Sequence, residues 1–253
     1  MPELPEVETT IRGLQPLVNS TIINIKIHTL KLRFFIPKKI MRIKNGIIKD
    51  IVRRGKYILL GINNDHILII HLGMSGRLRL INNNKFIRKK HDHFVLRTNH
   101  DHCLVFNDAR KFGFLDYGER KNINKKKYLL NLGVEALGRK LNDRYLLSKI
   151  SKSVVPIKQI LLDQRIIAGI GNIYASEILF NAKISPLERG KDLSINQCKK
   201  LIFSIRKILK KAIKAGGSTL KDYVSTDGTV GNFQNNFKVY NKANQKILGK
   251  KIK

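Results

Sequence analysis

The first residues of the chain combine a proline with two nearby glutamates, in the opening MPELPEVETT. If the initiator Met1 is removed, as a small second residue permits, Pro2 carries the terminal amine. An α-amino group titrates at about pH 8, so part of this secondary amine is a free nucleophile at neutral pH. Its attack on an aldehyde-like carbon gives an iminium ion, which favours β-elimination, and Glu3 and Glu6 are close enough in sequence to carry protons. The alternative is structural, because proline also suits the first turn of a helix.

The segment KHDH at 90–93 places two histidines and an aspartate close together, and such side chains bind metal ions. Adjacent side chains on an extended segment point to opposite faces, so they do not converge on one ion. The two cysteines, Cys103 and Cys198, are far apart and lack CxxC spacing, so they form neither a disulfide framework nor a cysteine zinc site. We therefore predict that this sequence holds no metal and no other cofactor.

The chain is strongly basic: 50 Lys and Arg against 18 Asp and Glu give its 253 residues a formal net charge of +32. Self-repulsion of this size indicates a polyanionic partner such as nucleic acid, although A·T-rich codons for Lys, Ile and Asn would also raise the lysine content. With 42% hydrophobic residues the chain can bury a core, and no apolar run approaches the ~20 residues of a membrane helix. Acids stand where a signal peptide has basic residues, which predicts a cytoplasmic protein without a membrane partner.

Secondary-structure elements must position these residues, and the spacing of apolar residues that predicts such elements changes along the chain. Residues 3–17 have apolar side chains at helical spacing and predict an opening helix. From about 21 to 117, short β-branched or aromatic runs alternate with Asn, Gly, Asp and Lys clusters, which predicts an antiparallel sandwich or barrel. The runs are TIINIKIHTL, GIIKDIVR, KYILLGI, HILIIHL, GRLRLI, HFVLRT, CLVFND and FGFLDY. We place the first domain at 1–120.

In the second half of the chain, apolar residues recur at helical spacing. A Lys/Asn segment at 120–127 predicts a solvated linker, within a connection that we place at 121–135. The helical domain is placed at 136–216, where two glycines end it, and its predicted helices are 142–151, 156–164, 172–180 and 194–215. A loop rich in Gly, Ser, Thr and Asp covers 217–236 and is long for a connection. The remaining residues, 237–253, could begin a hairpin.

Seven segments occur in one order: MPELPEVETT, RRGKY, HLGMSG, KHDH, DARKFG, GIGNIYASE and GGSTLKDY. Together they closely resemble the formamidopyrimidine-DNA glycosylases, bacterial base-excision repair enzymes for oxidised purines, from Pro2 to about Tyr240. The opening PELPEVE distinguishes this family from the related endonuclease VIII group. The resemblance implies an α+β fold, with an N-terminal antiparallel β-sandwich that has an opening helix and a C-terminal helix–two-turn–helix domain. It also implies a monomer without an obligate protein partner.

The activity implied by the resemblance is that of a bifunctional DNA glycosylase and AP lyase. It would excise 8-oxoguanine and formamidopyrimidines from duplex DNA. Pro2 would attack the deoxyribose C1′ carbon and form a Schiff base, and β-elimination would follow. Glu3 would be the general acid/base at the sugar, with Glu6 in support. Lys56, in RRGKY, would assist elimination and contact a phosphate near the lesion.

Other matching residues concern the DNA itself. A flipped nucleotide leaves a gap in the base stack, which apolar wedges fill, and an arginine can bond to the orphan base. Met74, Arg110 and Phe112 match these residues, and the glycines around Met74 and Phe112 indicate loop tips rather than core positions. The predicted DNA-binding residues are His71, His91, Arg110, Lys152, Lys158 and Asn172.

The turn GIGN comes directly before a predicted helix, for which Asn172 would be the N-cap. Free backbone N–H groups at that helix start would bind a phosphate. Ser218, Thr219 and Tyr223 lie in the loop that, by resemblance, closes over the flipped purine. Backbone N–H groups of this loop could recognise an added carbonyl oxygen. Without the resemblance, the loop would be an ordinary polar hairpin.

The carboxyl-terminal segment departs from the family pattern. The family usually ends in a β-hairpin zinc finger with two CxxC pairs and an arginine that grips phosphates, whereas NKANQKILGKKIK has no Cys, His or Arg. Residues 237–253 would then be a remnant of that hairpin without zinc ligands, for which natural loss, truncation and gene decay are all open explanations. We expect weaker DNA binding with a flatter salt dependence, and a δ-elimination step without its family arginine. Two rival hypotheses are a DNA- or lesion-binding protein with weakened or lost catalysis, and a general basic nucleic-acid-binding protein.

Overall fold

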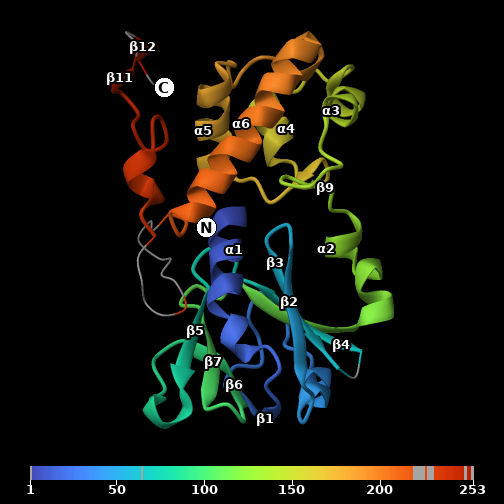
Figure 1. The fold of residues 1–253 in the computed structure, drawn as a ribbon, viewed down its shortest axis with the longest axis vertical. Helices are drawn as coiled ribbons and strands as arrows, with labels where there is room; N and C mark the ends of the chain where they lie inside the picture. Colours follow the sequence, from blue (N-terminus) through green and yellow to red (C-terminus); the bar gives the residue numbers. More distant parts are fainter. Residues whose placement is uncertain (1, 64, 219–225, 227–230, 248–249, 252–253) are drawn as a thin grey trace.

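Both predicted halves are present in the computed structural model, which describes residues 2–63, 65–218, 226, 231–247 and 250–251 (Figure 1). The strands of the first half of the chain occupy the lower half of this view, most helices lie in the upper half, and α1 lies between them. The fold is therefore α+β, as predicted.

Two four-stranded antiparallel sheets form the first half of the chain. Their strand orders are β1-β6-β7-β5 and β2-β3-β4-β8. The bounds are β1 Ile22–Ile27, β2 Ile48–Arg54, β3 Tyr57–Ile62, β4 His66–His71, β5 Arg77–Asn82, β6 Asp92–Thr98, β7 His102–Asn107 and β8 Phe114–Glu119. Each predicted run between 21 and 117 corresponds to one of these strands, so the prediction of an antiparallel sandwich is confirmed.

The core of the sandwich consists of side chains that alternate along the strands. Ile58 and Leu60 from β3 and Phe94 and Leu96 from β6 are fully buried in one cluster. Successive side chains of a strand point to opposite faces, so this spacing of two residues directs each pair to the same interior. The sandwich is thus a packed support for the loops at its edges.

Helix α1 (Leu4–Gly13) lies at the boundary between the sandwich and the helical half. Leu4 is buried in the helical core, whereas Val7 and Ile11, further along the same helix, are buried in the sandwich core. The N–H of Leu4 also donates to the carbonyl of Gly169 at 3.0 Å. The predicted opening helix is confirmed, and the residues just before it are held where two cores meet.

The segment that joins the two halves is more structured than the sequence suggested. It forms the 3-10 helix η4 (Arg120–Lys125) and the short helix α2 (Lys127–Leu130). Ile123 and Leu129 are buried in a cluster with side chains of β4. Residues 120–127 are mostly exposed, in keeping with a solvated linker, but the segment is folded and Ile123 anchors it to the sheet, which the sequence did not predict.

Four helices dominate the second half, as predicted. Their bounds are α3 Asp143–Ile150, α4 Ile157–Leu162, α5 Asn172–Ala182 and α6 Ile195–Lys214. The Ser194 hydroxyl caps α6 by accepting from the N–H of Gln197 at 3.2 Å. Gly216, with φ of +76°, follows the end of α6, as the sequence predicted. Two short strands, β9 (Val134–Glu135) and β10 (Ile167–Ala168), pair in parallel and were not predicted.

The remaining described elements are short. They are the 3-10 helices η1 Gln15–Leu17, η2 Lys38–Ile43, η3 Asn83–Lys85, η5 Gly190–Asp192 and η6 Phe233–Asn236, and the strands β11 Lys246–Ile247 and β12 Lys250–Lys251. β11 and β12 pair in antiparallel fashion, so the predicted hairpin near the carboxyl end is confirmed. None of the helices in the described ranges is long and apolar enough to cross a membrane. The domain limits at 120, 135 and 216 stay predictions.

Candidate functional site

The carboxylate of Glu3 is seated on the first turn of α5. Glu3 is 2% exposed, and its two oxygens accept the N–H groups of Gly171 at 2.7 Å, Ile173 at 2.9 Å and Tyr174 at 3.4 Å. A Cβ at position 171 would lie 2.4 Å from Cδ of Glu3, so this approach requires glycine. The site residue from the amino terminus is thus bound to a helix start more than 160 positions later in the chain.

This arrangement corrects one prediction about the same helix start. The sequence suggested that the N–H groups there bind a phosphate and that Asn172 is the N-cap. In the structure Gly171 is the N-cap, Asn172 is the first helical residue, and three of the N–H groups already have the Glu3 carboxylate as their anion. The positive end of a helix favours any anion, and the carboxylate of this chain occupies it first. Asn172 itself is exposed, and its side chain stays a predicted DNA contact.

Burial raises the pKa of Glu3 from 4.5 to about 7. The charge of Lys56 opposes this rise, that of Glu6 adds to it, and the N–H bonds from Ile173 and Gly171 oppose it. A carboxyl group with a pKa near neutrality exists in both protonation states at physiological pH. Glu3 can therefore give a proton in one step of a reaction and take one in another.

Glu6 connects three separate parts of the site. Its Oε2 accepts the N–H of Glu3 at 2.9 Å, and its Oε1 accepts the hydroxyl of Tyr174 at 2.6 Å and the N–H of Ser218 at 2.7 Å. The Ser218 hydroxyl donates to the same Oε1 at 3.0 Å. Burial, followed by the Glu6 charge, raises the pKa of Tyr174, which keeps its hydroxyl a donor. Glu6 thereby fixes the amino terminus to α5 and to the start of the predicted lesion loop.

Lys56 lies in the two-residue turn between β2 and β3. Gly55 precedes it with φ of +56°, a conformation that favours glycine. Lys56 is 8% exposed, and burial lowers its pKa, while the charges of Glu3 and Glu6 raise it. Within the described ranges its ammonium has no hydrogen bond or ion pair. Lys56 is therefore a buried cation without a close anion of its own.

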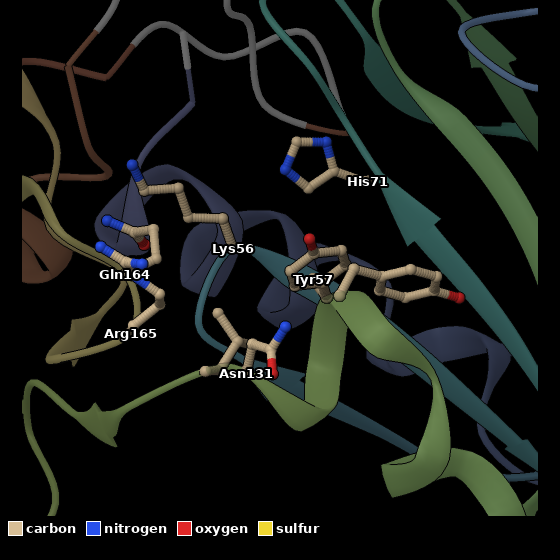
Figure 2. A pocket seen from close by; sticks show the side chains of 8 residues that line it. Lys56, Tyr57, His71, Asn131, Gln164 and Arg165 are labelled. Carbon is tan, nitrogen blue, oxygen red and sulfur yellow. The ribbon is translucent and has the colours of Figure 1, made fainter.

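A cavity opens beside Lys56, between the sandwich and the helical half. It has a volume of about 200 Å³ and is lined by Lys56, Tyr57, His71, Tyr128, Asn131, Leu132, Gln164 and Arg165. Figure 2 shows Lys56 on the same side as Gln164 and Arg165, with Tyr57 and His71 across from them. Lys56 and several polar groups thus line this space, and the Arg165 guanidinium is paired with Asp163 at 2.7 Å.

His71 is held as a neutral hydrogen-bond donor in this cavity. Its Nδ1 accepts the N–H of Gly73 at 3.1 Å, which leaves the proton on Nε2. Burial, together with the charges of Lys56 and Arg33, lowers the pKa of His71 from 6.5 to about 4. Its ring stacks on Phe114 at a centroid distance of 5.4 Å. At neutral pH His71 therefore offers an N–H and no charge.

The three predicted wedge residues lie on two neighbouring loops. Met74 is 39% exposed and Phe112 is 44% exposed, which confirms that they are loop-tip rather than core side chains. The guanidinium of Arg110 lies 4.8 Å from the ring centre of Phe112. The buried Asp108 carboxylate accepts the Ser75 hydroxyl at 2.6 Å and the N–H of Gly113 at 2.8 Å, so it joins both loops.

The KHDH segment is engaged in structural contacts. His93 contacts Thr29 Oγ1 and the Asp108 carbonyl, both at 2.8 Å, and the Arg79 guanidinium donates to both oxygens of Asp92. His91 is half-buried with φ of +70° and stays a predicted phosphate contact. No group of three or more His, Cys, Asp or Glu side chains in the described part of the chain could hold a metal ion.

The two cysteines do not fit the family zinc site. Cys103 is buried on β7 in the sandwich, whereas Cys198 is buried in the helical core. They are in different halves of the molecule and cannot ligate one ion together. The absence of a cofactor stays a prediction.

The other predicted site residues are distributed as follows. Pro2 is buried at the start of α1, Lys152 is exposed between α3 and α4, and Lys158 is half-buried on α4. Thr219 and Tyr223 lie outside the described residues. The structure thus gathers Pro2, Glu3, Glu6, Lys56 and Ser218 around one junction, while Lys152 and Lys158 lie on the helical half.

Two carboxylates that the sequence did not single out also hold the site together. Glu177 on α5 is buried and accepts the N–H groups of Lys238 at 2.9 Å, Val239 at 2.9 Å and Tyr240 at 2.8 Å. Glu135 on β9 accepts from the hairpin that carries Lys56. The sequence held one signal for Glu177, which is a charged residue among the apolar residues of a predicted helix. No local feature of the sequence identifies Glu135.

Comparison with known proteins identifies the family. A model of the formamidopyrimidine-DNA glycosylase N-terminal domain matches residues 1–115, and a model of the formamidopyrimidine-DNA glycosylase H2TH domain matches residues 132–224. The chain belongs to the formamidopyrimidine-DNA glycosylase family. It is therefore a DNA glycosylase of base-excision repair, and the resemblance seen in the sequence is confirmed.

Relatives and solved structures agree with this family membership. The formamidopyrimidine-DNA glycosylase of Zymomonas mobilis is 47% identical over 96% of this chain and 89% of its own length, and that of Rickettsia felis is 44% identical over 98% and 90%. A mutant Fpg of Lactococcus lactis, in complex with DNA that contains Fapy-dG, has a TM-score of 0.89 at 34% identity, covering 98% of this chain and 91% of that one. The Thermus thermophilus MutM (Fpg) protein has a TM-score of 0.85 at 34% identity, covering 96% and 88%.

Proposed function

We propose that this DNA glycosylase excises oxidised purines, namely 8-oxoguanine and formamidopyrimidines, from duplex DNA, and that it then cleaves the abasic strand by β-elimination. The observation that carries the proposal is the environment of Glu3. Its carboxyl group is buried and has a pKa of about 7. It follows Pro2 directly in the sequence and interacts electrostatically with Lys56. This combination supplies a nucleophile, a proton carrier and a cation at one junction.

The proposed reaction begins at the amino terminus. The lone pair of the Pro2 nitrogen forms a bond to C1′, the glycosidic bond breaks with its electrons on the base, and the base takes up a proton. The Pro2 nitrogen then loses its proton, and opening of the sugar ring, in which O4′ takes up a proton, gives the iminium ion. Loss of a C2′ proton then expels the 3′ phosphate, which is the β-elimination. Glu3 is the proton carrier at the sugar, because its pKa near neutrality permits both directions of transfer.

Lys56 and His71 are the proposed contacts for the DNA backbone beside the lesion. Lys56 supplies a buried positive charge without a partner in the described part of the chain, and His71 supplies an N–H. Both line the cavity of about 200 Å³ (Figure 2). Phosphate contacts of this kind position DNA without reading its sequence. Met74, Phe112 and Arg110 would fill the gap that the extruded nucleotide leaves.

Relatives support DNA as the partner and leave the range of lesions open. Lactococcus lactis Fpg has been solved with DNA that contains Fapy-dG and with DNA that contains an oxidised pyrimidine. For the present chain we propose duplex DNA with an oxidised purine as substrate. We further propose that it acts as a monomer in the cytoplasm, without an obligate protein partner.

Borohydride trapping tests this function. The protein is mixed with a duplex that contains 8-oxoguanine opposite cytosine, and borohydride reduces any iminium to a stable adduct. We expect an adduct for the wild type and none for Pro2→Gly or for a form that retains Met1. Tight binding to the lesion without a trapped species would instead favour a lesion-binding protein with weakened catalysis.

A further inference from the structure

Glu135 lies where the linker meets the hairpin that carries Lys56. Its Oε1 accepts the N–H of Gly55 at 2.7 Å and Nη1 of Arg54 at 2.8 Å, and its Oε2 accepts Nη1 of Arg53 at 2.5 Å. One carboxylate thus contacts the three residues that precede Lys56. These bonds link β9, at the edge of the helical half, to the end of β2 in the sandwich.

The two arginines are held at their other ends as well. Nε of Arg53 donates to Oε2 of Glu8 on α1 at 2.9 Å. Nη2 of Arg54 donates to the carbonyls of Leu132 and Gly133, each at 2.8 Å. The network therefore connects the Lys56 hairpin both to α1, which begins at the nucleophile end of the chain, and to the linker.

The peptide groups of Gly55 are bonded on both sides. Its N–H donates to Glu135, and its carbonyl accepts Nη1 of Arg53 at 3.1 Å. A Cβ on Gly55 would lie 3.3 Å from Cβ of Ala168, so the turn also packs closely against β10. The backbone at Lys56 is consequently fixed relative to the helical half.

Lys56 depends on this backbone for its position. Its ammonium has no hydrogen bond or ion pair within the described ranges that would fix it directly. Burial raises the pKa of Glu135, but the charges and hydrogen bonds of Arg53 and Arg54 outweigh it and leave the pKa below its ordinary value. Glu135 therefore stays ionised at neutral pH and keeps its bonds.

We propose that Glu135 is a positioning residue for Lys56: it fixes the turn at Gly55 and so holds the lysine in its place at the cavity between the two halves. The inference rests on the proposed function, in which Lys56 assists elimination. Catalytic groups must lie close to their productive geometry, and a displacement of about 1 Å can lower a rate by about 100-fold. A merely structural Glu135 would instead stabilise the junction without acting through Lys56.

A double-mutant cycle separates the two roles. The single-turnover rate of β-elimination on abasic duplex DNA is measured for the wild type, Glu135→Gln, Lys56→Ala and the double variant. We expect Glu135→Gln alone to lower the rate by about 10- to 100-fold. In the Lys56→Ala background the same substitution should change it by less than about 2-fold, because the group that Glu135 positions is already absent.

Two further variants keep the cycle interpretable. Glu135→Asp retains the charge on a shorter side chain and should recover part of the rate; it replaces Glu135→Gln in the cycle if the latter does not fold by circular dichroism. Asp50→Asn is the matched control, because Asp50 is on the same strand β2 and pairs with Arg120 at 2.7 Å, in an exposed ion pair. It should leave the rate unchanged.

The outcomes distinguish this inference from the proposed function. If the wild type gives no borohydride adduct, the proposed function fails and the inference fails with it. If the wild type is trapped but the losses of Glu135→Gln and Lys56→Ala multiply in the double variant, only the positioning role is overturned. An unchanged rate in Lys56→Ala, with normal trapping, also overturns it, because there would be no position to maintain.

Discussion

Replacing Glu3 by glutamine should change the way in which the stability of the protein depends on pH. Burial holds the pKa of Glu3 at about 7 in the folded chain, against 4.5 as its ordinary value. The folded state therefore binds the Glu3 proton more tightly than the unfolded state does. The associated stabilisation is fully present below pH 4.5 and is lost as the pH rises through 7. The difference between the two pKa values corresponds to about 3 kcal/mol.

Glutamine has no ionisation and removes this pH-dependent contribution. It also changes the hydrogen bonds, because one carboxylate oxygen becomes an NH2 group that faces the N–H groups of Gly171 or Ile173. That loss costs about 1–3 kcal/mol and does not vary with pH. We therefore expect Glu3→Gln to be less stable than the wild type at about pH 4. The difference should shift by about 3 kcal/mol in favour of the variant by about pH 8.5.

Urea unfolding followed by circular dichroism at several pH values measures this shift. The comparison uses the difference between variant and wild type, so that other titrating groups cancel. Glu119→Gln is the control, since the Glu119 side chain is 43% exposed and pairs with exposed Lys121 at 3.7 Å, and pairs of this kind contribute little. A difference for Glu3→Gln that stays constant within about 1 kcal/mol from about pH 4 to 8.5 would refute the raised pKa and the reasoning from burial.

Three further substitutions test the geometry of the site. Gly171→Ala would place a Cβ 2.4 Å from Cδ of Glu3. We expect the free energy of unfolding, measured in urea, to fall by about 1–3 kcal/mol, and no borohydride adduct to form. Normal trapping would contradict the close approach of Glu3 to residue 171. Met74→Ala, at a 39% exposed position, should change the free energy of unfolding by less than about 0.5 kcal/mol. It should slow base flipping about ten-fold, which stopped-flow fluorescence of a 2-aminopurine beside the lesion measures. Tyr174→Phe removes the donor at 2.6 Å from Glu6 and should cost about 1–3 kcal/mol; an unchanged urea midpoint would contradict a role for that bond.

The strands and long helices could be predicted because their periods are local properties of the sequence. The strands of the sandwich are short β-branched or aromatic runs bounded by turn residues, and the apolar face of α6 recurs at helical spacing. The anchoring of the linker to the sheet was not predicted, because its two buried residues, Ile123 and Leu129, stand among lysines and asparagines. Strands β9 and β10 have two residues each, too few for any period to be visible.

The site was predictable only as far as residue types and order along the chain define it. The opening PELPEVE and the segment RRGKY point to Pro2, Glu3 and Lys56. The sequence could not show that Glu3 occupies the start of α5, because that contact joins segments 168 positions apart. Glu177 was missed for a similar reason: its partners are backbone N–H groups, and these leave no signature in the side chains of the residues that supply them.

The acidic residues of this basic chain explain how a net charge of +32 is compatible with a compact site. Glu3, Glu6, Asp108 and Glu177 are all buried, and each accepts backbone N–H groups that position a segment of the site. Their negative charge is therefore directed inward, at helix starts and loop junctions, where it stabilises the geometry. In the described part of the chain, nine ion pairs are formed, so most of the 50 lysines and arginines have no carboxylate partner there; exposed charges of this kind are screened by salt. The charge imbalance that suggested a polyanionic partner is thus compatible with a compact site, because these buried carboxylates arrange the site while the unpaired cations remain available to attract DNA.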